Sequence, residues 1–142
     1  LWARWRDAAR HGKPSVERFQ AAVAAFRTAS ALDRFRATPE EWQARAWLDR
    51  ARLQTRDAMD AGRGLAAAHL ALRRDARSAE ACLVLGQLRK LLGTIGPPQS
   101  RSVNRAEGER SIDLALALNG NLRSRANAFQ DAGPGIGQSL LD

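Results

Sequence analysis

The sequence predicts an all-α protein made of paired helices that stack on one another. Alanine and leucine are abundant, whereas valine, isoleucine and threonine are scarce, and this balance favours helix over strand. No segment alternates apolar and polar residues over the length of a strand. Small and large apolar residues instead recur at helical spacing between Ser78 and Asn121, with Gly86 at a predicted close contact between two helices. The 142 residues suffice for one domain.

The charge is strongly positive and unevenly distributed. The chain carries a net charge of +8 with a pI near 11.4. Residues 1–36 hold eight basic and three acidic residues, a balance of +5, whereas residues 111–142 hold two and three, a balance of −1. Such a balance favours acidic partners, either a protein segment or nucleic acid.

The first two predicted helices lie in the basic N-terminal region. The first spans Trp2 to Arg10 and ends at His11-Gly12. The second runs from Ser15, a potential N-cap after a proline, to Arg34. Its predicted buried stripe has helical spacing and comprises Val16, Phe19, Val23, Phe26 and Leu32.

The third and fourth predicted helices form the middle of the chain. The third begins with a capping box at Thr38-Pro39-Glu40-Glu41, in which Glu41 reaches back to the cap, and continues to Ala61 before Gly62. Its polar side carries Arg45, Asp49, Arg52, Arg56 and Asp60. That side is interpreted either as a solvated face or as an arginine-bearing wall of a binding site. The fourth helix is predicted from Gly64 to Asp75.

Three more helices are predicted in the C-terminal half. The fifth is capped by Ser78 and ends at Gly93. Thr94 to Asn104 contains Gly96-Pro97-Pro98 and is predicted to be a loop. The sixth helix spans Arg105 to Asn119, and a short seventh spans Leu122 to Asp131. The glycine-rich end, residues 132–142, is predicted to be a flexible tail without the features of a phosphate loop.

Two stretches resemble tetratricopeptide repeats, a family of 34-residue helical hairpins. In the last stretch, Leu85-Gly86, Ile112 and Ala115 fall at the family's contact positions, and Asn119-Gly120-Asn121 replaces its usual turn. In the first, Ala22, Phe26 and Ala29 keep its alanine-aromatic-alanine spacing. The middle stretch matches mainly at Ala71-Leu72 and Asp75-Ala76. The layout is also similar to the C-terminal repeat tails of bacterial signalling proteins such as serine/threonine protein kinases.

The resemblance implies a right-handed superhelical array of antiparallel helix pairs, with about three divergent units and about seven helices. Residues 1–131 would form one domain with units 1–36, 38–77 and 78–121 and a capping helix 122–131. It also implies a non-catalytic module or scaffold that binds a protein segment in a concave helical surface. The implied partner-binding residues are Arg45, Arg52 and Arg56 of the middle unit, and the outward-facing Glu80, Leu83, Gln87 and Lys90 of the last unit.

Residues that could carry catalysis or bind a metal do not gather into any pattern along the sequence. His11 and His69 are far apart and Cys82 is the single cysteine, so we expect neither a metal nor a cofactor. Serine, histidine and aspartate all occur, so composition alone does not exclude a Ser-His-Asp catalytic triad. No catalytic motif accompanies these residues. We therefore expect no enzymatic activity in this stretch of chain, although a larger parent protein would be free to carry a catalytic domain.

The leading hypothesis is thus an interaction module for a protein segment with acidic residues. The alternative is a nucleic-acid-binding helical domain that uses the basic N-terminal region. The four tryptophans, Trp2, Trp5, Trp42 and Trp47, fit packing between helices better than stacking on bases. No membrane-spanning run occurs, and we expect a cytoplasmic location. The sequence predicts neither the partner's identity nor the oligomeric state.

Overall fold

The computed structural model describes residues 16–32 and 37–130, and the part it describes is all-helical, as predicted. The predicted helix Trp2 to Arg10 and the predicted tail 132–142 lie outside these residues. The described chain contains six α-helices: α2 (Val16–Leu32), α3 (Thr38–Arg50), α4 (Ala58–Arg74), α5 (Ala79–Ile95), α6 (Arg101–Leu118) and α7 (Arg123–Gln130). Three short helical turns connect them: the π-helix η1 (Ala51–Thr55) and the 3₁₀ turns η2 (Pro98–Ser100) and η3 (Gly120–Leu122).

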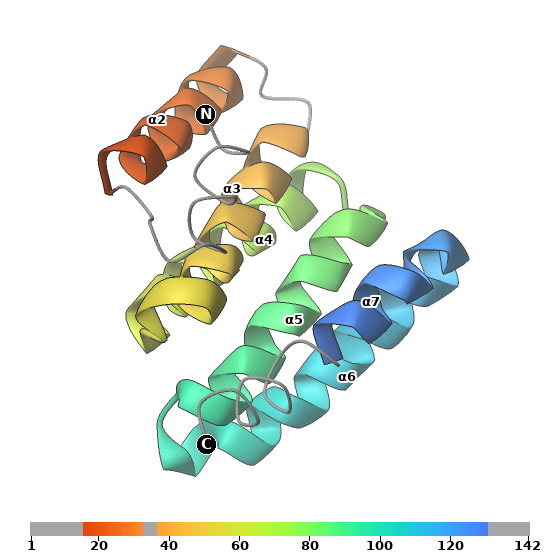
Figure 1. Cartoon of the computed structure of the whole chain (residues 1–142). Coiled ribbons are helices and arrows are strands. Elements are labelled where there is room, and N and C mark those ends of the chain that lie inside the picture. The colour runs from red at the N-terminus through yellow and green to blue at the C-terminus, as the bar shows by residue number, and fades with distance from the viewer. Residues whose placement is uncertain (1–15, 33–36, 131–142) are drawn as a thin grey trace.

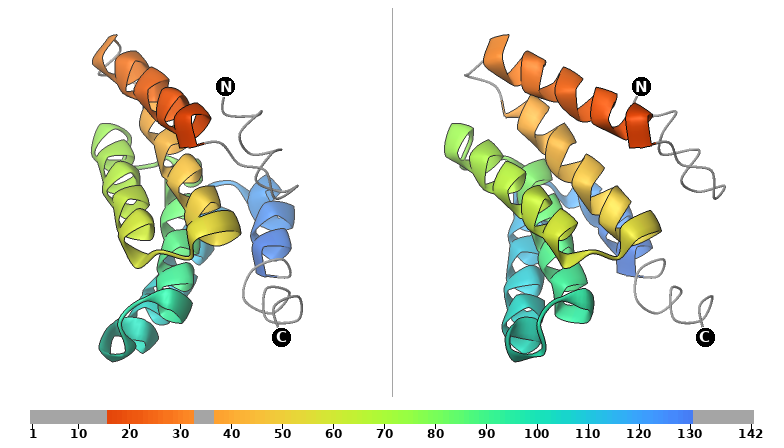
Figure 2. Two further views of the ribbon diagram at one scale, coloured as in Figure 1. Left: turned by 60° about the vertical axis from the view of Figure 1, so that its left-hand side comes forward. Right: turned by 90° about the vertical axis from the view of Figure 1, so that its left-hand side faces the viewer.

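From α2 to α6 each helix packs against the one before it, and α5 lies in the middle (Figures 1 and 2). The pairs α3/α4 and α5/α6 are antiparallel neighbours joined by tight turns. Helix α5 contacts both α3 and α4 of the preceding pair, and α7 contacts α5 while following α6 through η3. Four helices therefore surround α5.

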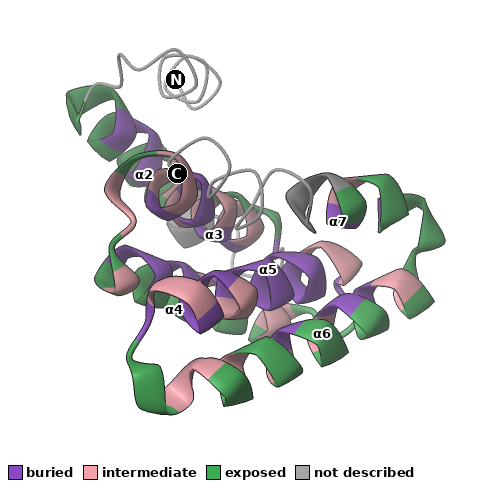
Figure 3. Cartoon of the chain, turned by 60° about the horizontal axis from the view of Figure 1, so that its bottom comes forward, coloured by how far each residue is buried: buried purple, intermediate pink, exposed green. Residues whose placement is uncertain are grey.

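The largest apolar cluster lies where α3 and α4 meet α5, and it pairs small residues with large ones. Alanines of α3 and α4 face leucines of α5, which lets the helix backbones approach closely. Figure 3 shows α5 as the most continuously buried helix. A second cluster joins α2 to α3, and a third joins α5, α6 and α7; their buried members are Phe19, Ala22, Val23 and Ala46, and Cys82, Leu83, Ile112, Ala115, Leu122 and Ala126. Of the predicted α2 stripe, Val16 is exposed.

The prediction of one helix from Thr38 to Ala61 is wrong, because the chain turns at Arg56 and Asp57. The π-helix η1 ends α3, and Arg56 takes a left-handed conformation with φ 50° and ψ 32°. Asp57 then caps α4 by accepting a hydrogen bond from the Met59 backbone N–H at 2.9 Å. The predicted break at Gly62 does not occur, because local capping at Asp57 outweighs the weak helix preference of that glycine.

The predicted loop from Thr94 to Asn104 is also mostly helical. Helix α5 continues to Ile95, and only Gly96 and Pro97 separate it from the 3₁₀ turn that begins α6 at Arg101 rather than at Arg105. Pro98 occupies the first position of a helical turn, where no backbone N–H is needed. Most residues of the predicted loop therefore belong to α5 or α6 and lengthen these two helices.

The predicted capping box at the start of α3 does not form. The preceding Ala37 has a helical conformation, and no side chain caps this end. Glu41 instead accepts a hydrogen bond from the Ser78 hydroxyl, 37 residues further along the chain. Ser78 does cap α5 as predicted, because its Oγ accepts a hydrogen bond from the Ala81 N–H at 3.1 Å. One serine thus connects the starts of two helices.

Glycines allow α5 and α6 to touch backbone to backbone. A Cβ atom at Gly86 would lie 2.6 Å from Ile112 Cγ1 and 2.7 Å from the Gly108 carbonyl oxygen. A Cβ at Gly108 would lie 2.8 Å from the Gly86 carbonyl oxygen, so each glycine requires the other to be small. Gly93 faces Arg101 and Arg105 of α6 in the same way. No larger residue fits these positions unless the helices separate.

We expect Gly86→Ala to destabilise the protein by about 1–3 kcal/mol, because the added methyl group meets backbone atoms that cannot move aside. The control is Gly62→Ala in α4, where nothing lies within 4 Å of the added Cβ. That change should stabilise the helix by roughly 0.5–1 kcal/mol. Urea unfolding followed by circular dichroism measures the free energy of unfolding of both variants. Equal changes in the two variants would contradict the close contact between α5 and α6 at Gly86.

Burial raises the pKa of Glu41 above its usual value of 4.5, and the nearby carboxylates of Glu80, Asp75 and Glu40 raise it further. The Ser78 hydroxyl opposes this shift by hydrogen-bonding to the carboxylate. A raised folded-state pKa means that the neutral carboxyl favours folding. This contribution is complete below pH 4.5 and is lost as the pH rises through the folded-state pKa.

We expect Glu41→Gln to raise the free energy of unfolding at pH 7, because the amide keeps an acceptor for Ser78 without the buried charge. Near pH 4 the variant and the original protein should converge, since Glu41 is then largely protonated. Urea unfolding across pH 4 to 7 tests this. A variant that is less stable at pH 7 would show that the ionised carboxylate is the stabilising form.

Candidate functional site

The structure brings two of the predicted partner-binding residues together. Arg45 of α3 and Glu80 of α5 form an ion pair with Nη1 3.6 Å from Oε1. The second oxygen of Glu80 accepts a hydrogen bond from Arg125 of α7 at 2.6 Å. Glu80 is therefore held between arginines from two other helices. We call Arg45, Glu80 and Arg125 the charged row.

The charged row crosses three helices that are not consecutive in the sequence. Helices α3, α5 and α7 lie side by side because α5 contacts both of the others. All three side chains are partly accessible, with exposed fractions of 19% for Arg45, 37% for Glu80 and 34% for Arg125. A partner reaching this face would meet two guanidinium groups around one carboxylate.

Arg52 and Arg56 do not join the charged row. Arg52 pairs with Asp49 one turn earlier in the same helical segment, at 3.8 Å. Arg56 occupies the turn between α3 and α4. The sequence placed Arg56 on a helical face only because the third helix was predicted to run through this turn.

Three predicted positions on α5 do not face outward. Leu83 is fully buried, and Gln87 is 3% exposed with its Oε1 atom lacking a hydrogen-bond partner. Lys90 is directed to α6, where its Nζ atom lies 2.7 Å from Oε1 of Glu109. The expectation of exposure is wrong here because other helices surround α5. Of the four predicted α5 positions, Glu80 alone keeps a substantially exposed side chain.

Arg125 was missed by the sequence analysis. It lies in the predicted seventh helix, but nothing local distinguishes it from the other arginines. The sequence offered only an indirect signal for Arg125, which lies in the neighbouring apolar residues. Leu122 and Ala126 are four residues apart and form the buried side that attaches this segment to α5 and α6. Arg125 adjoins that side and can therefore reach Glu80.

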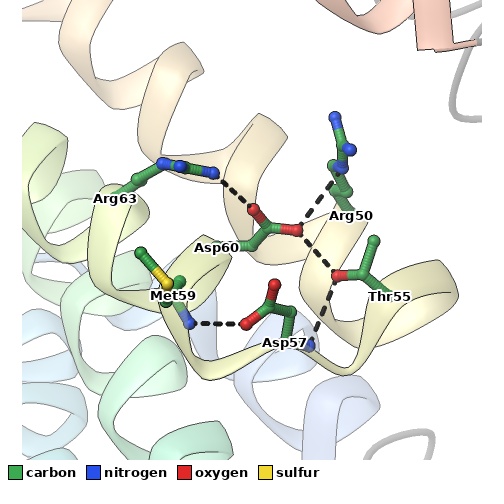
Figure 4. Close-up of polar contacts among 6 residues, drawn as sticks. All are labelled: Arg50, Thr55, Asp57, Met59, Asp60 and Arg63. Atoms are coloured by element: carbon green, nitrogen blue, oxygen red, sulfur yellow. Dashed lines mark hydrogen bonds and ion pairs between the residues drawn. The ribbon is translucent and has the colours of Figure 1, made fainter.

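A second polar cluster surrounds Asp60, which is 3% exposed (Figure 4). Its carboxylate accepts hydrogen bonds from the Thr55 hydroxyl at 2.8 Å and from Arg63 Nη1 at 2.9 Å. Arg50 Nε lies 3.4 Å from the same carboxylate. The Thr55 oxygen also accepts a hydrogen bond from the Asp57 N–H at 3.3 Å. The cluster thereby holds the turn between α3 and α4 in place.

The arginines of this cluster also cover aromatic rings. Arg50 lies 4.5 Å from the centroid of Phe19, and Arg63 lies 5.3 Å from that of Trp47. The two rings meet edge to face with centroids 4.9 Å apart. Trp42 stacks on Phe26 at 6.5 Å. Trp47 thus packs between helices as predicted, whereas Trp42 remains 42% exposed beside Phe26. Trp2 and Trp5 lie outside the described residues.

The described residues offer few groups for chemistry. Among them, no three His, Cys, Asp or Glu residues lie close enough to hold a metal ion. Burial raises the pKa of the Cys82 thiol, which reduces its thiolate content at neutral pH. Burial and the nearby Arg89 and Arg73 lower the pKa of His69. His11 lies outside the described residues.

Comparisons with known proteins assign no family to this chain. No family model, curated protein or solved structure matches it. Within the described ranges, none of the helices is both long enough and apolar enough to span a membrane.

We expect Asp60→Ala to destabilise the protein by about 3 kcal/mol, because it leaves Arg50 without its buried carboxylate partner. The control is Asp113→Ala on the exposed side of α6, which should change stability by less than about 0.5 kcal/mol. Chemical unfolding monitored by circular dichroism compares the two. A similar, small effect for both would mean that the Asp60 cluster does not stabilise the α3/α4 turn.

Proposed function

We propose that this chain is a non-catalytic interaction module that binds an acidic segment of a partner protein. The observation that carries the proposal is the charged row, in which Arg45 and Arg125 from different helices converge on Glu80. The chain as a whole carries a net charge of +8, which favours an acidic partner at this row of two arginines and one glutamate. A carboxylate of a partner is the natural complement to that positive charge.

The chemistry of arginine supports this choice of partner. A guanidinium group presents five N–H donors in a planar fork, which matches the two oxygens of a carboxylate. In Arg125, the Nη1 atom binds Glu80 while the buried Nη2 atom has no hydrogen-bond partner. The Arg125 side chain as a whole is 34% exposed, so a second carboxylate approaching α7 meets its accessible part, where a charge-assisted hydrogen bond forms.

The order of helix contacts supports the proposed architecture of stacked hairpins similar to tetratricopeptide repeats. In such an array, the first helix of each pair packs against both helices of the preceding pair. Helix α5 packs against α3 and α4 in this manner. We assign α2 to the end of a first unit, α3/α4 and α5/α6 to two further units, and α7 to a capping helix. Such modules fit a scaffold role within a larger bacterial signalling protein.

The function is tested by selecting binders from a random peptide library displayed on phage, using the immobilised chain. We expect the enriched peptides to be rich in Asp and Glu. Fluorescence anisotropy with the enriched peptide should show about three- to tenfold weaker binding to Arg125→Gln, which removes one charge-assisted contact. The matched control, Arg110→Gln, removes the same charge from an exposed site on α6 and should leave the affinity within about twofold, because the remaining long-range effect is screened.

Two outcomes would overturn the proposal. One is enrichment of peptides without acidic residues, and the other is equal loss of affinity in both variants. The same titration with an unrelated DNA duplex at about 50 and 200 mM salt covers the alternative function, since phosphate binding weakens steeply over this range. Tight, salt-sensitive DNA binding in place of peptide binding would favour a nucleic-acid-binding domain.

A further inference from the structure

Helix α4 has one side packed against α3 and α5 and the other side exposed. Its inward positions are buried, including Ala61, Gly64, Ala68 and Ala71. Figure 2 shows α4 at an edge of the helix array, with no described helix covering its outer side. The exposed residues at helical spacing along that side define the outer face of α4: Met59, Gly62, Arg63, Ala66, His69, Leu70 and Arg73.

The outer face combines two large apolar side chains with small residues between them. Met59 is 67% exposed and Leu70 is 37% exposed. They lie eleven positions apart, which corresponds to about three helical turns or roughly 16 Å. Gly62, Arg63, Ala66 and His69 lie between them, and a Cβ atom built at Gly62 would meet nothing within 4 Å. The surface therefore has open space at Gly62 beside the apolar side chain of Met59, into which a side chain of another helix can pack.

All formal charge on the outer face is positive. Arg63 and Arg73 lie ten positions apart, near Met59 and Leu70 respectively. The acidic residue of α4, Asp60, is buried in the cluster described above and is not part of this face. Arg63 keeps an exposed fraction of 54% although it also binds Asp60. The face thus offers two cations beside two apolar contacts.

We propose that the outer face of α4 binds an amphipathic helix of a partner protein, with acidic residues about three turns apart and apolar residues between them. Charge complementarity identifies the acidic residues, and the side chains of Met59 and Leu70 identify the apolar ones. This site is independent of the charged row, because it lies on a different helix and uses none of the same residues. A membrane-surface helix, by contrast, carries bulky apolar and aromatic residues along its whole length.

The probe is a synthetic 18-residue helical peptide with two glutamates eleven positions apart and two leucines between them on the same face. Fluorescence anisotropy at low salt measures its binding to the full chain. We expect Gly62→Leu to weaken binding by about tenfold or more, because the new side chain fills the open space on the face. The matched control is Ala106→Leu, which adds bulk to an exposed position on α6 and should leave binding unchanged.

A second pair of variants tests the charge. Arg73→Gln should weaken binding by roughly two- to fivefold, the effect of one exposed ion pair, whereas Arg110→Gln should have no effect. A control peptide with lysines in place of the glutamates should bind at least about tenfold more weakly. Circular dichroism of each variant confirms that helicity is kept.

The proposal is overturned if the acidic peptide does not bind at millimolar concentration, or if Gly62→Leu binds it as well as the original chain. It is also overturned if the face instead associates with vesicles of phosphatidylserine and phosphatidylcholine in a Gly62→Leu-sensitive manner without binding the peptide. A third contrary outcome is self-association of the chain, measured by light scattering, that Gly62→Leu abolishes while the peptide does not bind. That result would assign the face to a second copy of this chain.

Discussion

The close contact between α5 and α6 at Gly86 and Gly108 is the constraint on which the rest of the structure depends. Because the two backbones touch there, α6 occupies one side of α5 at the shortest practical distance. The remaining sides of α5 are left for α3, α4 and α7. With so many neighbours, α5 becomes the central buried helix, and Glu80 is exposed only where the covering helices leave a gap.

The turn between α3 and α4 is the second feature that shapes the molecule. A π-helical turn and a left-handed Arg56 end the first helix abruptly, and Asp57 starts the second. The buried carboxylate of Asp60 binds groups from both sides of this turn, and Arg50 extends the cluster to the Phe19 ring of α2. Polar and aromatic contacts thus connect α2, α3 and α4 around this turn.

The two faces proposed for partner binding differ in character. The charged row crosses three helices and offers arginines around a carboxylate, which suits recognition of acidic groups. The outer face of α4 belongs to one helix and combines the apolar Met59 and Leu70 with Arg73 and the Asp60-bound Arg63. A module with both could bind two partners together, or two segments of one partner, which would raise its overall affinity.

The sequence by itself determined the helical class, the Ser78 cap and the packing role of Trp47, because capping and helical spacing are local properties. It did not reveal that Glu41 bonds to Ser78 or that the chain turns at Arg56. At both places the local sequence favours another arrangement, a capping box at Glu41 and a continuous helix through Arg56. Only the tertiary structure decided that Leu83 and Gln87 are buried and that Arg125 completes the charged row. The reason is physical: a residue's exposure depends on every helix packed around it, and the helices around α5 come from distant parts of the chain.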